Sequence, residues 1–190
     1  MRYKVLNKNN FSLNSYEVIP IREKDMEDVR IWRNAQINVL RQKDIITKSD
    51  QQEYYEKKIK PLFKEDNPLQ LLFSFLENTK LIGYGGLVNI SWIDKRAEMS
   101  FLLDNNRAKD KRQYEKDMTN FIQIIKQLVF VELNFNRLFT ETYSFREYHI
   151  SILEKSGYKK EGVFREHIFY QNKYYDSILH SILKKEYYEK

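Results

Sequence analysis

Hydrophobic residues recur along the chain with two periods, and the way these periods alternate predicts a mixed α/β protein. One ladder has the i, i+3, i+4, i+7 spacing of an amphipathic helix of about four turns, which we expect to lie on a sheet. Its members are Met118, Phe121, Ile122, Ile125, Leu128 and Val129. Runs rich in aromatic and β-branched residues, bounded by turn-forming residues, predict strands. These runs are residues 16–22, 71–77, 81–90, 96–103, 137–143, 163–170 and 174–183.

Capping signals place three further helices between these strands. We expect Asp25 to cap a short helix that reaches residue 34. Ser49 with Gln52 has the spacing of a capping box, and the helix that follows is predicted to run until Pro68 breaks it.

The last of these helices covers residues 147–156. It ends at Gly157, because glycine takes the left-handed conformation after a helix without a side-chain clash.

The predicted order is therefore β-α-α-β-β-β-α-β-α-β-β, an α/β (α+β) fold with a mixed, mostly antiparallel central sheet flanked by helices. Residues 1–15 are expected to be an N-terminal extension or an edge element. The chain has 190 residues, of which 42% are hydrophobic and 32% charged, and it contains no linker-like stretch. We expect one domain over residues 1–190, since this length buries a sizeable single core.

Charge and cysteine content narrow the chemistry. The 33 Lys and Arg exceed the 27 Asp and Glu, so an anionic ligand is favoured: nucleic acid, an acidic membrane surface or a phosphorylated cofactor. Without cysteine the chain has no disulfide, no thiolate nucleophile and no cysteine zinc site. His149, His167 and His180 lack the spacing of a metal cluster, so no metal is predicted. No apolar run approaches the roughly 18 residues that span a bilayer, so we expect a cytoplasmic protein.

Four motifs in the right order give the chain a family resemblance. They are "PIREKDMEDVRIWRN", "LIGYGGLVNISWIDKRAEMSFLLD", "FTETYSFREYHISILEKSGYKKEGV" and "NKYYDSILHSIL". Together they resemble the GCN5-related N-acetyltransferase (GNAT) superfamily, and within it the RimJ/RimL-like branch. The resemblance implies a GNAT-like fold and transfer of an acetyl group from acetyl-CoA to a primary amine.

The resemblance also implies where acetyl-CoA binds. In the family, a loop of pattern Q/R-x-x-G-x-G/A leads from the fourth strand into the long helix, and its amides hold the diphosphate. The helix ladder aligns this loop with residues 113–118, where Lys116 and Met118 replace the glycines, and "NNRAKDKR" before it reads as an insertion. Such a loop holds the anion by another backbone path, by charge, or not at all; the alternative is a solvated loop. The implied cofactor contacts are Phe101, Leu102, Leu103, Gln113, Tyr114, Glu115, Lys116, Asp117, Met118, Thr119 and Arg146.

Amine acetylation needs a deprotonated amine, a stabilised carbonyl oxygen and an acid for the leaving thiolate. Glu98, in the fourth predicted strand where related enzymes place a carboxylate, is the first candidate for the base, and Glu141 is the second. The alternative for Glu98 is a surface ion pair with a cation such as Arg96.

The acid has no family counterpart, because Leu153 stands where related enzymes have a tyrosine. His149 and Tyr143 are the candidates, and bulk water is a third route for the thiolate proton. The alternative for His149 is a side chain that satisfies a helix start or faces solvent.

The acceptor side is expected between the first two helices and the last hairpin. A tryptophan-arginine-asparagine element similar to Trp32–Arg33–Asn34 occurs in acetyltransferases of nucleotide-linked amino sugars, so the acceptor is a sugar amine, another small amine or a protein terminus. The alternative for Trp32 is a core residue. The candidate acceptor contacts are Arg22, Trp32, Arg33, Asn34, Tyr170 and Tyr175.

Three functions therefore stay open. The favoured one is an acetyl-CoA-dependent amine acetyltransferase. The second is a related protein that binds acyl-CoA or another ligand without catalysis, which the missing glycines support. The third, a nucleic-acid-associated protein, is the least favoured, because the aromatic residues fall largely in predicted strands. The expected partners are acetyl-CoA and an amine, with no membrane, and the expected state is a monomer or homodimer.

Overall fold

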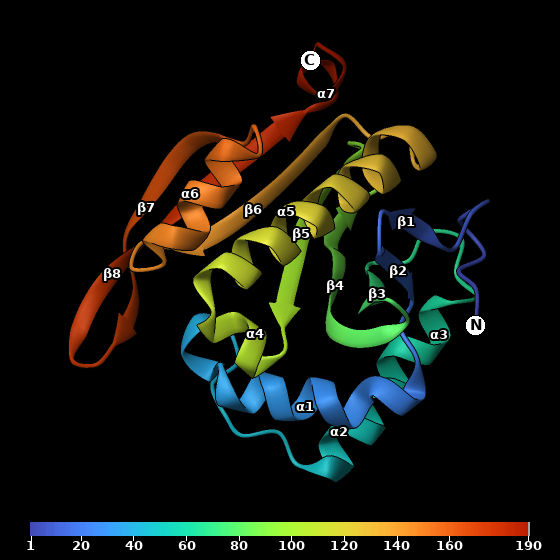
Figure 1. Ribbon diagram of the computed structural model, residues 1–190, viewed down its shortest axis with the longest axis horizontal. Helices are drawn as coiled ribbons and strands as arrows, with labels where there is room; N and C mark the ends of the chain where they lie inside the picture. The colour runs from blue at the N-terminus through green and yellow to red at the C-terminus, as the bar shows by residue number, and fades with distance from the viewer. Residues whose placement is uncertain (190) are drawn as a thin grey trace.

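One eight-stranded sheet organises residues 1–189, the part of the chain that the computed structural model describes (Figure 1). The strand order is β1-β2-β3-β4-β5-β6-β8-β7, with β5 and β6 parallel and the other neighbours antiparallel. The predicted mixed, mostly antiparallel sheet is confirmed. The strands are β1 (Phe11–Leu13), β2 (Tyr16–Pro20), β3 (Leu71–Glu77), β4 (Lys80–Ser91), β5 (Arg96–Leu103), β6 (Arg137–Tyr143), β7 (Lys159–Tyr170) and β8 (Lys173–Leu183).

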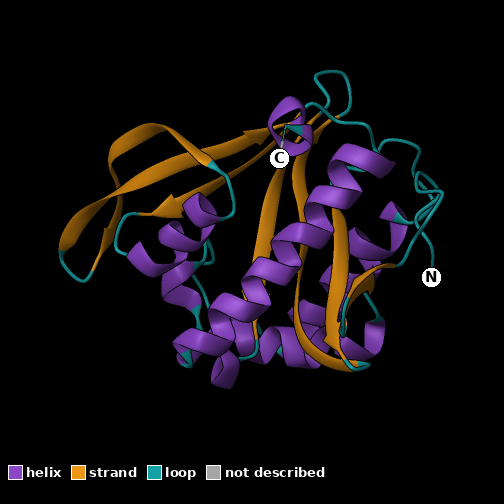
Figure 2. Ribbon diagram, turned by 45° about the horizontal axis from the view of Figure 1, so that its top comes forward, coloured by secondary structure: helices purple, strands orange, loops and turns teal. Residues whose placement is uncertain are grey.

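Helices lie on both faces of this sheet (Figures 1 and 2). The long helix α5 crosses one face with α6 beside it, and α1 and α2 pack on the other, towards Val88 and Ser100. The α-helices are α1 (Met26–Ala35), α2 (Lys48–Tyr54), α3 (Lys60–Leu62), α4 (Asn105–Lys109), α5 (Lys111–Lys126), α6 (Glu147–Lys155) and α7 (Lys184–Tyr188). Short 3-10 turns cover Glu23–Asp25 and Ile37–Val39, and π-helical turns cover Tyr55–Ile59 and Gln127–Glu132.

The core forms where α5 meets the sheet. All six residues of the predicted ladder are fully buried, so that prediction is confirmed. The Phe121 ring packs 5.1 Å from Phe75 and 4.8 Å from Phe101. Gly85 makes this approach possible, because a Cβ there would lie 2.8 Å from Phe121. Burying each large apolar side chain contributes about 1.5–3 kcal/mol, so this contact fixes α5 on the sheet.

Several predicted helix boundaries are wrong, each for a local reason. The capping box of α2 is formed by Thr47 and Asp50, not by Ser49 and Gln52. Asp25 makes no side-chain cap for α1, because its carboxylate accepts hydrogen bonds from Arg22 and Ser74 instead.

The ends of other elements also differ from the predictions. The second helical segment ends at Leu62, before Pro68. Helix α7 was not predicted, whereas the edge strand β1 within residues 1–15 agrees with the edge element that was one of the two expectations for this stretch.

The stretch predicted as an insertion forms α4 and the start of α5. Asp104 accepts hydrogen bonds from the amides of Asn106 and Arg107, and Asp110 accepts them from the amides of Arg112 and Gln113. These two aspartates cap two consecutive helices, so the chain turns from β5 into α5 without glycine.

The sheet opens between β5 and β6. The two strands pair only where Arg96, Ala97 and Glu98 face Arg137, Leu138 and Phe139. Beyond Glu98 and Phe139 the two strands are no longer paired and diverge. The first turns of α5 and α6 lie at this open end, which makes it the natural place for a site.

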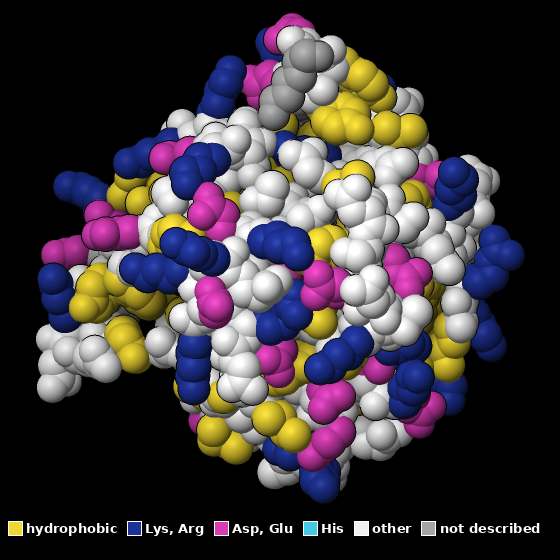
Figure 3. Space-filling view, viewed as in Figure 1, with side chains coloured by type: hydrophobic (Ala, Val, Ile, Leu, Met, Phe, Trp, Pro, Cys, Tyr) yellow, Lys and Arg dark blue, Asp and Glu magenta, His cyan; other side chains and the backbone are white. Residues whose placement is uncertain are grey.

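The surface supplies two further observations. On the face seen in Figure 3, Lys and Arg side chains are interspersed with Asp and Glu side chains, so this face carries no continuous basic stripe for a nucleic acid backbone. In residues 1–189 every helix is too short or too polar to cross a lipid bilayer.

Candidate active site

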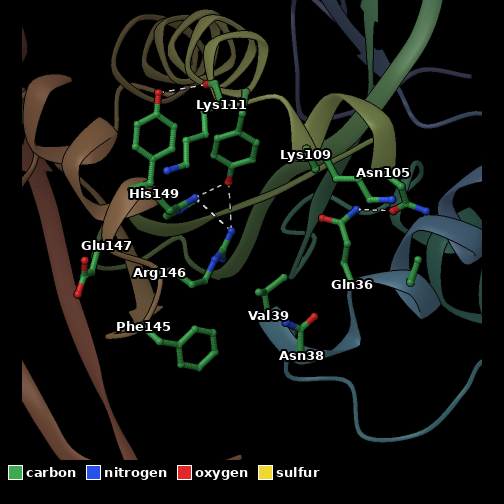
Figure 4. A pocket seen from close by; sticks show the side chains of 14 residues that line it. Gln36, Asn38, Val39, Asn105, Lys109, Lys111, Phe145, Arg146, Glu147 and His149 are labelled. Atoms are coloured by element: carbon green, nitrogen blue, oxygen red, sulfur yellow. Dashed lines mark hydrogen bonds between the residues drawn. The ribbon is translucent and has the colours of Figure 1, made fainter.

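A cavity of about 750 Å³ lies between the end of α1, the α4–α5 turn and the start of α6 (Figure 4). We call it the basic cavity. Lys109, Lys111 and Arg146 line it, and within residues 1–189 neither lysine has a carboxylate at ion-pair distance. On the side of α1, Gln36 donates to the Asn105 side chain at 2.7 Å and closes the cavity against α4. Uncompensated cations in a recess favour an anionic ligand.

Arg146 and His149 point towards each other at the start of α6 (Figure 4). Arg146 Nη2 donates to the Tyr114 hydroxyl at 3.1 Å and lies 3.2 Å from His149 Nδ1. The Tyr114 hydroxyl is 2.7 Å from the same nitrogen. Because a guanidinium only donates, His149 Nδ1 is the acceptor in this triangle and Nε2 carries the ring proton.

Burial, together with the positive charge of Arg146, lowers the pKa of His149 well below its usual range. The ring is therefore neutral at pH 7. A neutral imidazole that already accepts at Nδ1 suits the positioning of Arg146 better than the role of a protonated acid, and since its partners are side chains and it is buried, it neither satisfies a helix start nor faces solvent. Its effect is to hold the Arg146 guanidinium at the basic cavity.

The predicted placement of the cofactor loop at residues 113–118 is wrong. Helix α5 begins at Lys111, so these residues are already helical, and Asp110 takes the free amides that a diphosphate would need. Asp117 and Met118 are fully buried. The Tyr114 side chain lines the basic cavity, whereas Gln113 donates to Asp117 and Lys116 pairs with Glu77.

Two other residues from the predicted cofactor set, Glu115 and Thr119, do not line the basic cavity. Glu115 accepts from the Tyr148 hydroxyl and from Lys155, and Thr119 is a half-buried residue farther along α5. Leu102 and Leu103 are buried beside Tyr84 and Gly83 of β4.

An ion-pair network anchors α4 and explains why Arg107 is not available to a ligand. Its Nε and Nη2 atoms each donate to the Asp117 carboxylate at 2.7 Å, and Nη2 also donates to Glu77 at 2.8 Å. Tyr16 and Gln113 donate to the same carboxylate at 2.8 and 2.7 Å. The network fixes the α4–α5 turn, and thereby the backbone that carries Lys109 and Lys111.

A second cavity, of about 300 Å³, lies where β5 and β6 diverge. We call it the acidic cavity, because Glu98 and Glu141, here called the acidic pair, line it. It shares Val39, Arg146 and His149 with the basic cavity, so the two spaces are adjacent.

Glu98 is held by two donors. Arg41 Nη2 lies 2.7 Å from Glu98 Oε1 and 3.0 Å from Glu141 Oε2, and Asn89 Nδ2 donates to Glu98 Oε2 at 2.6 Å. Burial opposes the charge of Arg41, yet its hydrogen bonds to the acidic pair raise its pKa above the usual value. Arg96, the partner considered from the sequence, instead pairs with Asp94.

Asn89 owes its position to a β-bulge. The register between β4 and β5 shifts between Val88 and Ser91, and Asn89 has a left-handed φ of 48°. Asparagine tolerates this conformation, and bulges often redirect a side chain next to a site. The sequence contained one signal for it, a polar Asn inside the otherwise β-rich "LVNIS".

Tyr143 extends from β6 into the acidic cavity. Its hydroxyl donates weakly to the Leu40 carbonyl at 3.4 Å. Burial is the main cause that raises its pKa, so the hydroxyl keeps its proton at neutral pH and is available as a donor. Leu153, at the position of the tyrosine of related enzymes, is fully buried in the core.

The predicted acceptor contacts are brought together only in part. Arg33 lines the acidic cavity and donates to the Tyr84 hydroxyl at 2.6 Å. Trp32 is buried in the core, which was the alternative, and Asn34 binds Ile46 through its side-chain amide. Arg22 pairs with Asp25 and lines neither cavity.

Tyr170 and Tyr175 pack against Phe145 and line neither cavity. Their ring centroids are 5.6 and 5.1 Å from that of Phe145, which lines the basic cavity. Within residues 1–189 no three His, Cys, Asp or Glu side chains gather closely enough to hold a metal ion.

Comparisons with known proteins agree with this arrangement. The family model of the acetyltransferase (GNAT) domain matches residues 19–179. The SPbeta prophage-derived uncharacterized N-acetyltransferase YokL of Bacillus subtilis (strain 168) is 35% identical over 66 residues, which are 35% of this chain. The chain thus aligns with only 37% of the length of that relative.

Among solved structures, the spermidine N-acetyltransferase of Vibrio cholerae in complex with CoA and spermine superposes with a TM-score of 0.78 at 18% identity, over 92% of this chain and 99% of that chain. A dodecameric structure of that enzyme in an intermediate state gives a TM-score of 0.76 at 19% identity, over 93% of this chain and 98% of that chain. At these identities the superpositions establish the fold.

Proposed function

The chain belongs to the GNAT acetyltransferase family, and from this premise we propose that it transfers an acetyl group from acetyl-CoA to the primary amine of a small cationic acceptor. Transfer occurs by direct attack within a ternary complex, over one acetyltransferase domain that comprises residues 1–190. One observation carries the proposal: a buried carboxylate, Glu98, lies where β5 and β6 separate, and a basic cavity adjoins it.

The residues of the basic cavity fit acetyl-CoA. Lys109, Lys111 and Arg146 offer charge for a diphosphate, with Arg146 oriented by His149 and Tyr114. The edge of β5 beyond Glu98, including Phe101, is left unpaired by β6 and offers backbone groups to the pantetheine arm. Charge here takes the place of the glycine amides that the sequence lacks. When bound, acetyl-CoA supplies the acetyl group as an activated thioester.

Glu98 is the proposed general base. It takes a proton from the acceptor amine, directly or through one water molecule, while Asn89 fixes one carboxylate oxygen. Tyr143 keeps its proton at neutral pH and lines the same cavity, so we assign it the proton for the departing thiolate.

The acidic pair favours a cationic acceptor. Two carboxylates at one cavity attract an ammonium, and the arginines of the same lining, Arg33, Arg41 and Arg146, supply the opposite charge. The spermidine N-acetyltransferases among the superposed structures support a polyamine-like amine. A protein terminus, as in the RimJ/RimL-like branch, and an amino sugar are the other acceptors to test.

Two observations favour a second function. Asp104 and Asp110 cap the two helices at the basic cavity, and Arg41 donates hydrogen bonds to the Glu98 carboxylate. Both would suit a protein that binds acyl-CoA without transferring its acyl group.

The two functions are separated by combining a thermal-shift titration with acetyl-CoA and a free-thiol assay. The acceptor panel holds spermidine, glucosamine 6-phosphate and an N-terminal peptide. Thermal stabilisation together with amine-dependent thiol release, largest for spermidine, is the expected result. Stabilisation with no thiol release from any amine would contradict the enzyme and leave the second function.

A further inference from the structure

Arg41 reaches the acidic pair from outside the sheet. It follows the 3-10 turn Ile37–Val39, in a segment without regular structure that continues to residue 47. Its side chain is 54% exposed, whereas those of Glu98 and Glu141 are 7% and 15% exposed. A long side chain from an irregular segment therefore ends between two nearly buried carboxylates.

The Arg41 side chain lines two cavities and lies between them. On one side is the acidic cavity, and on the other is a cavity of about 490 Å³ between the β4–β5 bulge and the β7–β8 hairpin, here called the outer cavity. Both are lined by the same four residues, Arg41, Asn89, Glu98 and Glu141. The guanidinium and the acidic pair thus form the partition between the outer cavity and the proposed place of acetyl transfer.

The segment that carries Arg41 is held at two points. Gln42 and Ile46 are bound by the side-chain amide of Asn34. Between them Ile45 is 64% exposed. Because the arginine itself is more than half exposed, its ion pairs are screened by solvent and exchange readily with another cation.

We propose that Arg41 is a resident cation that occupies the amine-binding position between Glu98 and Glu141, and that an acceptor must displace it. The inference rests on the proposed function and narrows the acceptor to amines that arrive protonated. An ammonium that replaces the guanidinium keeps both carboxylates compensated. A neutral acceptor would leave Glu98 without the cation that Arg41 supplies, and Glu141 with only His167, whose Nε2 lies 3.5 Å from its Oε1.

Displacement also explains how Glu98 becomes a base. While Arg41 is in place, both carboxylate oxygens of Glu98 accept its N–H groups, so the guanidinium stands where the amine would have to approach. Once the guanidinium leaves, Glu98 faces the ammonium that replaced it, and that ammonium is the group whose proton it has to accept.

The test uses methylguanidinium chloride as a probe of the vacated position, with the full chain and without acetyl-CoA. Arg41→Ala is expected to bind the probe about tenfold more tightly than the unmodified protein, because the internal competitor is gone. Adding Glu141→Gln to this variant should abolish the gain. Arg41→Lys keeps a cation there and should behave as the unmodified protein, and Arg2→Ala removes the same charge from an exposed site that lines neither cavity.

Kinetics give the second readout. Arg41→Ala should lower KM for spermidine by about tenfold, and methylguanidinium should compete against the amine at about tenfold lower concentration in this variant than in the unmodified protein. Equal probe affinity in Arg41→Ala and the unmodified protein, or a KM that rises in Arg41→Ala, would overturn the inference, the latter because Arg41 would then contact the bound acceptor. Probe binding needs no turnover, so absence of thiol release from every variant would contradict the proposed function while the titration still decides the role of Arg41.

Discussion

Substituting Asp117 with Asn tests whether the buried ion-pair network holds the α4–α5 turn. The carboxylate is fully buried and accepts two hydrogen bonds from Arg107, one from Gln113 and one from Tyr16. Burial and the bond to Asp117 raise the pKa of Tyr16, as expected beside an ionised carboxylate. The variant keeps the shape of the side chain but removes its charge and turns an amide N–H towards donors.

The expected loss in free energy of unfolding depends on which hydrogen bonds Arg107 keeps in the variant. It loses one of its two bonds to residue 117, since the asparagine carbonyl oxygen still accepts the other, and it retains the bond to Glu77 at 2.8 Å. Removing one partner of a buried pair costs about 3–5 kcal/mol, and the retained bonds place Asp117→Asn at the lower end, about 3 kcal/mol. Since domains are stable by about 5–15 kcal/mol, the variant should stay folded at 25 °C but unfold at clearly lower urea concentration.

The assay is urea unfolding followed by circular dichroism, with Arg107→Met and the double variant included. Each single variant should lose about 3 kcal/mol, and the double variant should lose less than the sum, because no buried charge is then left without its partner. Glu53→Ala, which breaks the exposed pair with Lys57, serves as the control and should lose less than about 0.5 kcal/mol. A loss below about 1 kcal/mol for Asp117→Asn, or full additivity in the double variant, would refute the reasoning.

Two further predictions concern the site. Glu98→Gln should reduce kcat by about 10²-fold or more at pH 7 while thermal stabilisation by acetyl-CoA is unchanged, and a kcat within about threefold of the unmodified protein would exclude Glu98 as the base. The depressed pKa of His149 means that the unfolded chain binds a proton at higher pH than the fold does, so this contribution to stability is complete above about pH 6.5 and is lost as pH falls. The free energy of unfolding from urea titrations between pH 7 and 5 should therefore fall more steeply for the unmodified protein than for His149→Gln, by up to about 1.4 kcal/mol per pH unit, and equal slopes would contradict the assignment of a buried neutral ring.

The sequence predicted best those elements whose signal is periodic. Strands β3, β5 and β6 have the predicted bounds, since aromatic and β-branched runs end there at turn residues. The apolar ladder of α5 was predicted correctly for the same reason, because its spacing alone places it on the sheet.

The start of α5 was missed because its determinants are not periodic. Asp104 and Asp110 act as caps inside a polar stretch that reads as a loop. Helix α4 has no buried residue of its own, and it is held by the contact of Arg107 with Asp117, ten positions along the chain. A family alignment that looked for glycines placed the predicted loop on residues that are already helical.

The candidate site shows the same division. Glu98 was predicted as a candidate base because the family resemblance pointed to that position, and it lines the acidic cavity. Arg41 was missed because it lies 57 positions from Glu98 and belongs to no element, so only tertiary structure brings the two together. Asn89 depended on a bulge that no spacing rule contains.

The most direct test of the central claim is a calorimetric titration of acetyl-CoA, because the account holds that charge in the basic cavity replaces the missing glycine amides. Lys109→Ala/Lys111→Ala should weaken binding by about tenfold or more. Two controls should leave the affinity unchanged: Lys116→Ala, whose lysine pairs with Glu77, and Lys58→Ala/Lys64→Ala, which removes the same charge from the exposed surface of the α2–α3 segment. No heat of binding to the unmodified protein, or a loss for Lys116→Ala as large as that for Lys109→Ala/Lys111→Ala, would contradict the claim.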